Sequence, residues 1–234
     1  MLGTEVRADW SLLIVFGLIL FDLGAGVFPR WHPDWSEPFV WVMALAAATL
    51  FFLSVLAHEL SHALVGRAQG IPVRRITLFL FGGAAHLEGE PSSPKAEFWM
   101  AIVGPITSLA IGIAATGLGV AISQDILLPG QMGITEETLS QLPPVSTLLL
   151  WLGPINIVLA AFNVLPGFPL DGGRVLRAAL WALTGDFTRA TGWAAGVGRG
   201  FGWLLIALGM LQVFGGAGLQ GLWLVLIGWF LSTA

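Results

Sequence analysis

The run His58-Glu59-Leu60-Ser61-His62 is the part of this sequence whose residue types and spacing point most directly to chemistry. On an α-helix, residues i and i+4 lie on the same face, so the two imidazoles of an HExxH run can bind one metal ion. Glu59 follows the first of these ligands, and its carboxylate is placed to take a proton from a water molecule at the metal. We interpret the run as a zinc-binding motif with its own general base.

A catalytic zinc site has three protein ligands and one open position, so a third ligand must come from elsewhere in the chain. The residues leave three candidates, Asp22, His86 and Asp171. Asp22 lies inside an apolar stretch with no motif around it, and a pore or packing role and a gating role explain it equally well. Asp171 precedes two glycines and an amphipathic segment, so it is also a plausible helix N-cap. The two roles of Asp171 are compatible because a carboxylate has two oxygens.

Asp171 belongs to an unusual segment, residues 163–174, with the sequence NVLPGFPLDGGR. Its two prolines, Pro166 and Pro169, interrupt an apolar helix near its end. Backbone exposed at membrane depth is tolerated only where it is buried in protein or lines a water-filled cavity. This segment and the HExxH run both lie near the ends of apolar stretches, on the side that the basic residues described below assign to the cytoplasm. We therefore expect them to meet at a similar depth in the membrane.

The composition places these motifs in a lipid bilayer. Apolar residues make up 56% of the 234 residues and charged residues only 10%, whereas about 25% of a soluble domain is charged. This excludes the soluble globular, disordered and coiled-coil classes. The net charge of −4, with only 10 lysines and arginines, also argues against nucleic acid as a partner.

Six apolar stretches are candidates for crossing a hydrocarbon layer of about 30 Å, which takes about 20 helical residues. They cover residues 10–28, 39–65, 98–122, 145–165, 201–214 and 219–231. The fifth is short and rich in glycine on both flanks. The sequence therefore predicts an all-α polytopic membrane protein with about six transmembrane helices.

The distribution of basic residues predicts the orientation of these helices. With a cytoplasmic N-terminus, nine of the ten basic residues fall on the inside and only Arg30 falls outside, as the positive-inside rule requires. We expect a multi-pass protein of the cell membrane with both termini in the cytoplasm. The nine inside residues are Arg7, Arg67, Arg74, Arg75, Lys95, Arg174, Arg177, Arg189 and Arg199.

The segment between the second and third apolar stretches differs from the rest of the chain in its residue types. Residues 73–81 read VRRITLFLF, are rich in strand-forming types, and are followed by Gly82 and Gly83. Two glycines between short apolar runs predict a β-hairpin, and its apolar faces predict that it dips toward the membrane and borders a cavity. A surface loop with a chance pair of glycines is the alternative.

The HExxH run inside an apolar stretch, with NxxPxxPLDG about a hundred residues later, resembles the site-2 protease family of intramembrane zinc metalloproteases. Residues 81–108, FGGAAHLEGEPSSPKAEFWMAIVGPITS, are similar to the archaeal and bacterial branch that includes the sporulation pro-factor protease. The resemblance covers about residues 57–177, half of the chain.

The resemblance implies one zinc ion held by His58, His62 and Asp171, with Glu59 as general base. It implies a single transmembrane protease domain over residues 1–234, with a catalytic core at about residues 39–183. Helices 1, 5 and 6 would be peripheral and could form the gate through which substrate enters. The lipid bilayer is the expected environment of this domain.

The resemblance also implies how a substrate is held. Asn163 would hold the substrate backbone, although a cap at the end of a helix explains an asparagine there as well. The hairpin at Gly82 and Gly83 would offer a strand edge to an extended substrate, a form of β-augmentation.

From these features we expect an enzyme that hydrolyses a peptide bond within or near the transmembrane segment of single-span membrane proteins and releases a cytoplasmic fragment. Many relatives carry a nucleotide-sensing pair of CBS domains or a PDZ domain, neither of which is found in this sequence. We therefore expect any regulatory domain or protein to lie outside this chain. Two alternatives stay open, a transporter with broken helices and an inactive membrane scaffold. The lack of an internal repeat disfavours the first, and the intact HExxH and LDG motifs disfavour the second.

Overall fold

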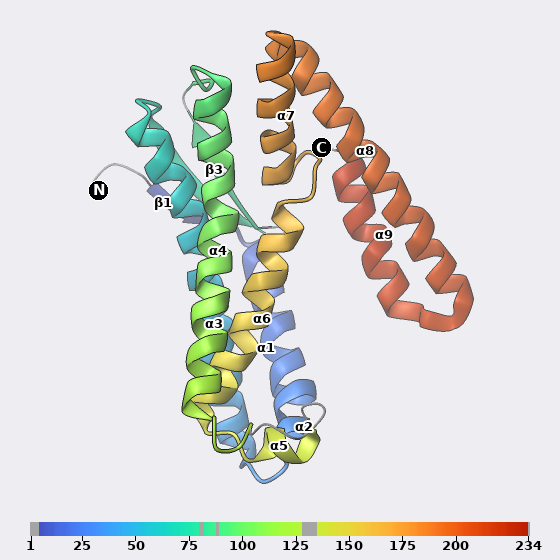
Figure 1. The fold of residues 1–234 in the computed structure, drawn as a ribbon. Coiled ribbons are helices and arrows are strands. Elements are labelled where there is room, and N and C mark those ends of the chain that lie inside the picture. The colour runs from blue at the N-terminus through green and yellow to red at the C-terminus, as the bar shows by residue number, and fades with distance from the viewer. Residues whose placement is uncertain (1–4, 80–81, 88, 128–134, 234) are drawn as a thin grey trace. The chain divides into compact units, whose positions relative to one another are not determined.

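The structure, a computed structural model, describes residues 5–79, 82–87, 89–127 and 135–233. The chain forms two compact units, which are described separately (Figure 1). Unit 1 comprises Met1–Glu88 and Ile106–Ala160, and unit 2 comprises Gly89–Pro105 and Ala161–Ala234. The division falls within one long helix, α4 (Pro94–Ile122), and near the end of another, α6 (Pro144–Asn163).

The longest helix of unit 1 is α3 (Glu37–Ala68), which carries the HExxH run. A proline in its first turn suits a helix start, because the first backbone N–H groups have no partner inside the helix. Gly70, with a φ of 80°, turns the chain back after the last residue of α3. This left-handed conformation allows the backbone N–H of Ile71 to donate to the carbonyl of Gly66 at 3.0 Å.

The other helical elements of unit 1 precede or follow α3 in the sequence. They are α1 (Ser11–Asp22), the π-helical turn η1 (Leu23–Val27), α2 (Phe28–Trp31) and α5 (Glu136–Ser140), together with the parts of α4 and α6 named above. One buried apolar cluster joins η1, α2 and the first half of α3. Its members are Leu23, Phe28, Val40, Met43, Ala44 and Ala47.

A three-stranded sheet completes unit 1, with the strand order β1 (Glu5–Ala8), β2 (Val73–Phe79) and β3 (Gly82–Leu87). Strand β2 pairs with β1 in parallel and with β3 in antiparallel orientation. Gly82 and Gly83 lie within β3, opposite Phe79 and Leu78, so they form part of a strand and not of the turn. Residues 80 and 81 lie outside the described residues. The expected dip of strands β2 and β3 toward the membrane stays a prediction.

The sheet is anchored to α3 on the segment that precedes and follows the first histidine. Ile76 of β2 has no solvent exposure and packs with Val55 and Ala63 of α3. Burial of a side chain such as Ile76 or Val55 contributes about 1.5–3 kcal/mol. The strands are therefore held directly beside the HExxH turn.

Unit 2 contains α7 (Asp171–Thr184), α8 (Phe187–Gln212), the turn η2 (Val213–Ala217) and α9 (Gly218–Thr233). Helices α8 and α9 pack side by side (Figure 1), and glycines stand at their closest approach. A Cβ atom added to Gly202 would lie 2.7 Å from the carbonyl oxygen of Gly228. Small residues of this kind let two helix backbones approach closely in lipid.

Among the described residues, five helical segments are long and apolar enough to cross a membrane. They are Ser11–Trp31, Glu37–Ala68, Pro94–Ile122, Pro144–Asn163 and Phe187–Gly216. The fifth is far longer than the expected 201–214, because α8 already begins at an N-cap, Asp186, whose side chain accepts a hydrogen bond from the backbone of Arg189 at 3.0 Å. The last apolar helix, Gly221–Thr233, is shorter, so a sixth span stays a prediction.

Candidate metal centre

The HExxH run forms one turn of α3, and its three ionisable side chains are buried. His58 is 3% exposed, His62 4% and Glu59 9%. The imidazole rings of His58 and His62 lie 4.9 Å apart between centroids, at an angle of 73°. The hydroxyl of Ser61 donates a hydrogen bond to the backbone carbonyl of His58 at 2.6 Å, so its partner is the backbone of α3 itself. The two histidines therefore lie on one face of α3, as their spacing of four residues predicts.

A serine from another helix contacts the first histidine. Oγ of Ser108, in α4, lies 2.8 Å from Nδ1 of His58, and Ser108 has no solvent exposure. A hydrogen bond at one ring nitrogen decides which nitrogen faces a metal. With Nδ1 paired to Ser108, Nε2 is the nitrogen through which His58 would bind a metal.

In unit 2, glycines hold the segment between α6 and α7 tightly against its neighbours. A side chain at Gly172 would overlap the carbonyl oxygens of Val164 and Leu165. One at Gly173 would overlap the backbone of Gly167. Only glycine fits such contacts, so the LDGG sequence is required by backbone packing directly after Asp171.

Asp171 is the first residue of α7, and the N-cap position is held by Leu170. The sequence-based expectation that Asp171 is itself an N-cap is therefore wrong, because the helix begins one residue earlier than that role requires. A carboxylate in the first turn is still stabilised by the positive end of the helix dipole. Asp171 is partly exposed, and its oxygens are suited to act as metal ligands.

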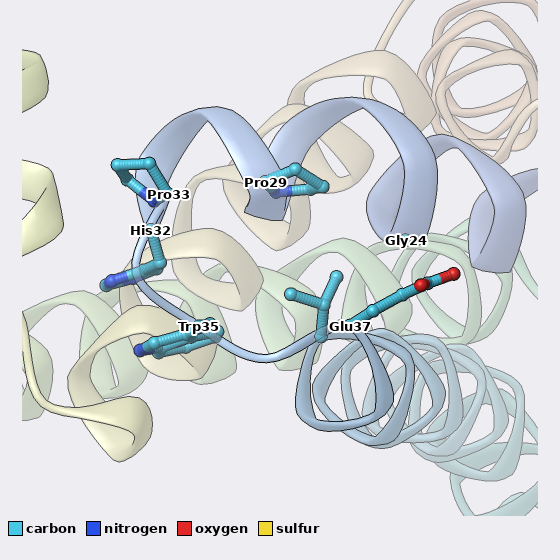
Figure 2. Close-up of a pocket in the computed structure, with 7 residues that line it drawn as sticks. Gly24, Pro29, His32, Pro33, Trp35 and Glu37 are labelled. Carbon is cyan, nitrogen blue, oxygen red and sulfur yellow. The ribbon is translucent and has the colours of Figure 1, made fainter.

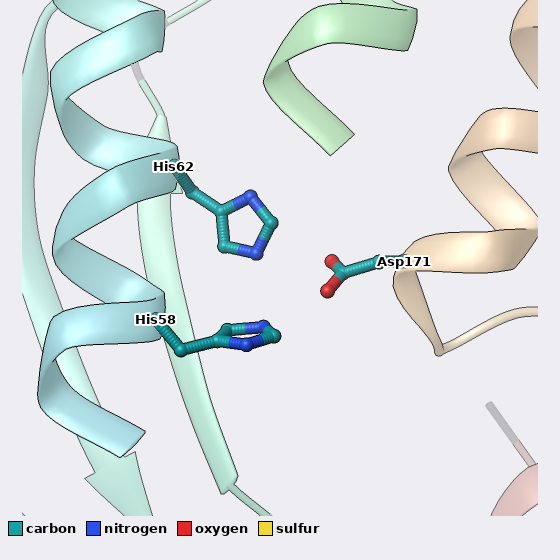
Figure 3. Close-up of side chains that lie close together, drawn as sticks. All are labelled: His58, His62 and Asp171. Atoms are coloured by element: carbon teal, nitrogen blue, oxygen red, sulfur yellow. The ribbon is translucent and has the colours of Figure 1, made fainter. Parts of the chain in front are cut away.

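His58, His62 and Asp171 come close together. One ligand atom from each lies within 4.8 Å of the others (Figure 3). Two imidazole nitrogens and one carboxylate oxygen are a donor set that zinc accepts in catalytic sites. The residues present therefore fit a zinc ion.

The other sequence-based candidates have different positions. Asp22 is exposed at the end of α1 and does not belong to the metal-ligand cluster. The side chain of His86 lies outside the part of the chain that the structure describes. Asn163 is the last residue of α6 and is partly exposed, a position that fits both a helix-end role and contact with a substrate.

Sequence reasoning missed a buried ion pair in unit 2. Glu97, in the first turn of α4, has no solvent exposure and accepts a hydrogen bond from Nε of Arg177 in α7 at 2.7 Å. Nη2 of Arg177 donates to the same oxygen, and Nε of Arg174 lies 4.0 Å from it. The guanidinium of Arg177 also lies 5.0 Å from the ring centre of Phe168 and 4.7 Å from that of Phe187, within cation–π range.

Two cavities within the units do not involve the metal-ligand cluster. The cavity in unit 1, of about 160 Å³, lies beside the link between α2 and α3, where the His32 ring stacks on Trp35 at 3.7 Å (Figure 2). Its lining consists of Gly24, Pro29, His32, Pro33, Trp35, Glu37 and Val40. The cavity in unit 2, of about 310 Å³, is lined by Pro94, Lys95, Phe98, Val175, Ala178, Ala179 and Ala182.

The profile of one known family matches residues 46–207, a range that includes the HExxH run and the LDGG segment. The chain belongs to peptidase family M50. A protein of Synechocystis sp. is 41% identical over 97% of this M50 chain and 54% of its own length. Rip3 of Mycobacterium tuberculosis is 38% identical over 99% of the chain and 55% of its own length. Both bear "zinc metalloprotease" in their names.

This M50 chain spans about half the length of the curated relatives it matches. Its fold is similar to that of the Site-2 Protease from Methanocaldococcus jannaschii, with a TM-score of 0.60 over 99% of this chain and 92% of that one, at 24% identity. The bacterial and archaeal sources agree with the family resemblance drawn from the motifs. Family membership and the five apolar helices make the chain a multi-pass membrane protein.

Proposed function

We propose that this M50 chain is a zinc metalloendopeptidase that cuts single-span membrane proteins within or near their transmembrane segment. The observation that carries the proposal is the cluster of His58, His62 and Asp171, with ligand atoms within 4.8 Å of one another. Glu59, the buried residue that follows His58 in α3, supplies the carboxylate. Ionisable groups are costly in an apolar helix and usually mark function there.

His58, His62 and Asp171 would hold one zinc ion per chain. When bound, zinc supplies a Lewis acid that acidifies water and polarises the scissile carbonyl. Glu59 accepts a proton from the attacking water as the water oxygen bonds to the carbonyl carbon. The same carboxyl group then delivers that proton to the amide nitrogen as the C–N bond breaks, so that an acid and an amine are released.

A substrate helix must unwind before its peptide bond can be attacked, and the freed backbone groups then need partners. Strand β3 is an edge of the three-stranded sheet, so an extended substrate can pair beside it by β-augmentation. Gly82 and Gly83, at the start of β3, would allow a close approach. The side-chain amide of Asn163 would pair with further substrate backbone.

The orientation completes the proposal. The N- and C-termini lie in the cytoplasm of the cell, as the basic residues predict, and the HExxH turn lies toward the cytoplasmic end of α3. Cleavage there releases a fragment inward. The protease is one domain with a catalytic core at about residues 39–183, and a regulatory domain or protein would act from outside this chain.

Cleavage of a tagged model substrate tests the proposal. The probe is a single-span protein with an Ala/Leu-rich transmembrane helix and a Gly-Pro pair near its cytoplasmic end, reconstituted with the purified chain in vesicles. We expect the wild type to release a soluble fragment and Glu59→Gln to release at least about 100-fold less while it still binds zinc. Glu136→Gln, an exposed acid in α5, is the control and should cleave normally. Equal release of fragment by Glu59→Gln and wild type would contradict the role of Glu59 as general base. No release by the wild type would contradict the proposed function and favour a scaffold or transporter.

A further inference from the structure

Two buried histidines in unit 1 each contact a hydroxyl group. Nδ1 of His58 lies 2.8 Å from Oγ of Ser108, and Nε2 of His32 lies 2.8 Å from Oγ1 of Thr147. All four residues are at most 3% exposed. The pairs are thus matched in length and burial, but only His58 belongs to the HExxH run.

The Ser108 contact has a direct consequence for the tautomer of His58. A neutral imidazole carries one N–H group, and its other nitrogen holds a lone pair. If Nδ1–H donates to the serine oxygen, the lone pair stands on Nε2. Partners of this kind orient metal-binding histidines and make the ligating nitrogen more basic.

At this location a serine is better suited to pair with His58 than a carboxylate, which is a common partner of metal-binding histidines. A carboxylate beside the histidine would add another charge within an apolar span, which is costly. The neutral, compact hydroxyl of Ser108 fits a position with no solvent exposure. Its helix, α4, is separate from α3, so the contact also joins two helices of unit 1.

We propose that Ser108 is a positioning residue for the metal centre: its Oγ accepts a hydrogen bond from Nδ1–H of His58 and thereby holds Nε2 toward the zinc ion. This inference rests on the proposed zinc site and adds to it. Removal of the hydroxyl leaves His58 in place but allows its ring to rotate and to change tautomer. The affinity for zinc then falls, while the fold is retained.

Zinc affinity measured by competition with a chromophoric chelator tests the proposal in the detergent-purified chain. We expect Ser108→Ala to weaken zinc binding about ten- to a hundredfold. Thr147→Val, which removes the matched hydroxyl at His32, should leave the zinc affinity unchanged. Thermal unfolding of both metal-free variants serves to check that each is folded.

A second measurement needs no variant. The chain has only four histidines, so ¹⁵N-histidine labelling gives few signals, and the zinc-loaded wild type should show His58 bound through Nε2 with a protonated Nδ1. Binding through Nδ1, or equal zinc affinities for wild type and Ser108→Ala, would overturn the role of Ser108 alone. A wild type without zinc affinity would instead overturn the proposed function and this inference together.

Discussion

Arg177 of α7 donates hydrogen bonds from Nε and Nη2 to one carboxylate oxygen of Glu97, which is fully buried in the first turn of α4. Asp171 lies at the start of the same α7 helix. Within unit 2, the ion pair therefore fixes the short helix that carries the proposed third zinc ligand.

Breaking this ion pair from one side should destabilise the protein strongly. Arg177→Met leaves the Glu97 carboxylate buried without its main partner, and such changes cost about 3–5 kcal/mol. The double variant Glu97→Met with Arg177→Met should recover much of this loss, because no buried charge is left. Chemical unfolding in detergent measures both. Arg189→Met is the control, since Arg189 is exposed over the Trp193 ring. If Arg189→Met lowered the free energy of unfolding as much as Arg177→Met, the account would be contradicted.

Two glycines of α8 should respond in opposite ways to a methyl group. A Cβ atom at Gly198 would overlap the carbonyl oxygen of Phe168, whereas one at Gly200 meets no atom within 4 Å. Gly200→Ala should stabilise the helix by up to about 1 kcal/mol, as alanine is the better helix former. Gly198→Ala should lower the unfolding temperature and weaken zinc binding, because the segment leading to Asp171 must shift. Equal behaviour of the two variants would show that this segment does not depend on its contact with α8.

His32 predicts a pH dependence of stability. Burial lowers the pKa of His32 below its ordinary value of 6.5. Between the lowered pKa and 6.5, the unfolded chain binds more protons than the folded chain, so stability falls as the pH drops through this window. Unfolding measured from pH 7.5 to 5 should show this loss, and His32→Asn should reduce its slope. An unchanged slope in His32→Asn would assign the pH dependence to other groups.

The sequence predicted the parts of the centre that depend on local spacing. His58 and His62 share a face because they stand one helical turn apart, and the prolines at 166 and 169 predicted the break that precedes Asp171. Ser108 was beyond such reasoning. It stands 50 residues from His58 in the chain, and a single hydroxyl in an apolar helix gives no periodic signal.

The same limit applies to the other elements. Strand β1 has only four residues, too few for an alternating pattern, and it forms through its pairing with β2. The glycines of 196–202 lie inside α8, where Gly198 and Gly202 face close neighbours and Gly196 and Gly200 do not. Which glycine faces a neighbour depends on tertiary packing, and composition alone does not contain that information.

The metal content of the purified chain tests the central claim most directly. Zinc is offered to wild type, Asp171→Ala and Asp125→Ala, and bound metal per chain is measured after removal of the excess. Asp125 is an exposed acid and serves as the control. The account predicts about one zinc per chain in the wild type and the control, as a three-ligand site requires, and little in Asp171→Ala. Full zinc content in Asp171→Ala would show that another group is the third ligand, and a wild type that binds no zinc would contradict the metalloprotease account itself.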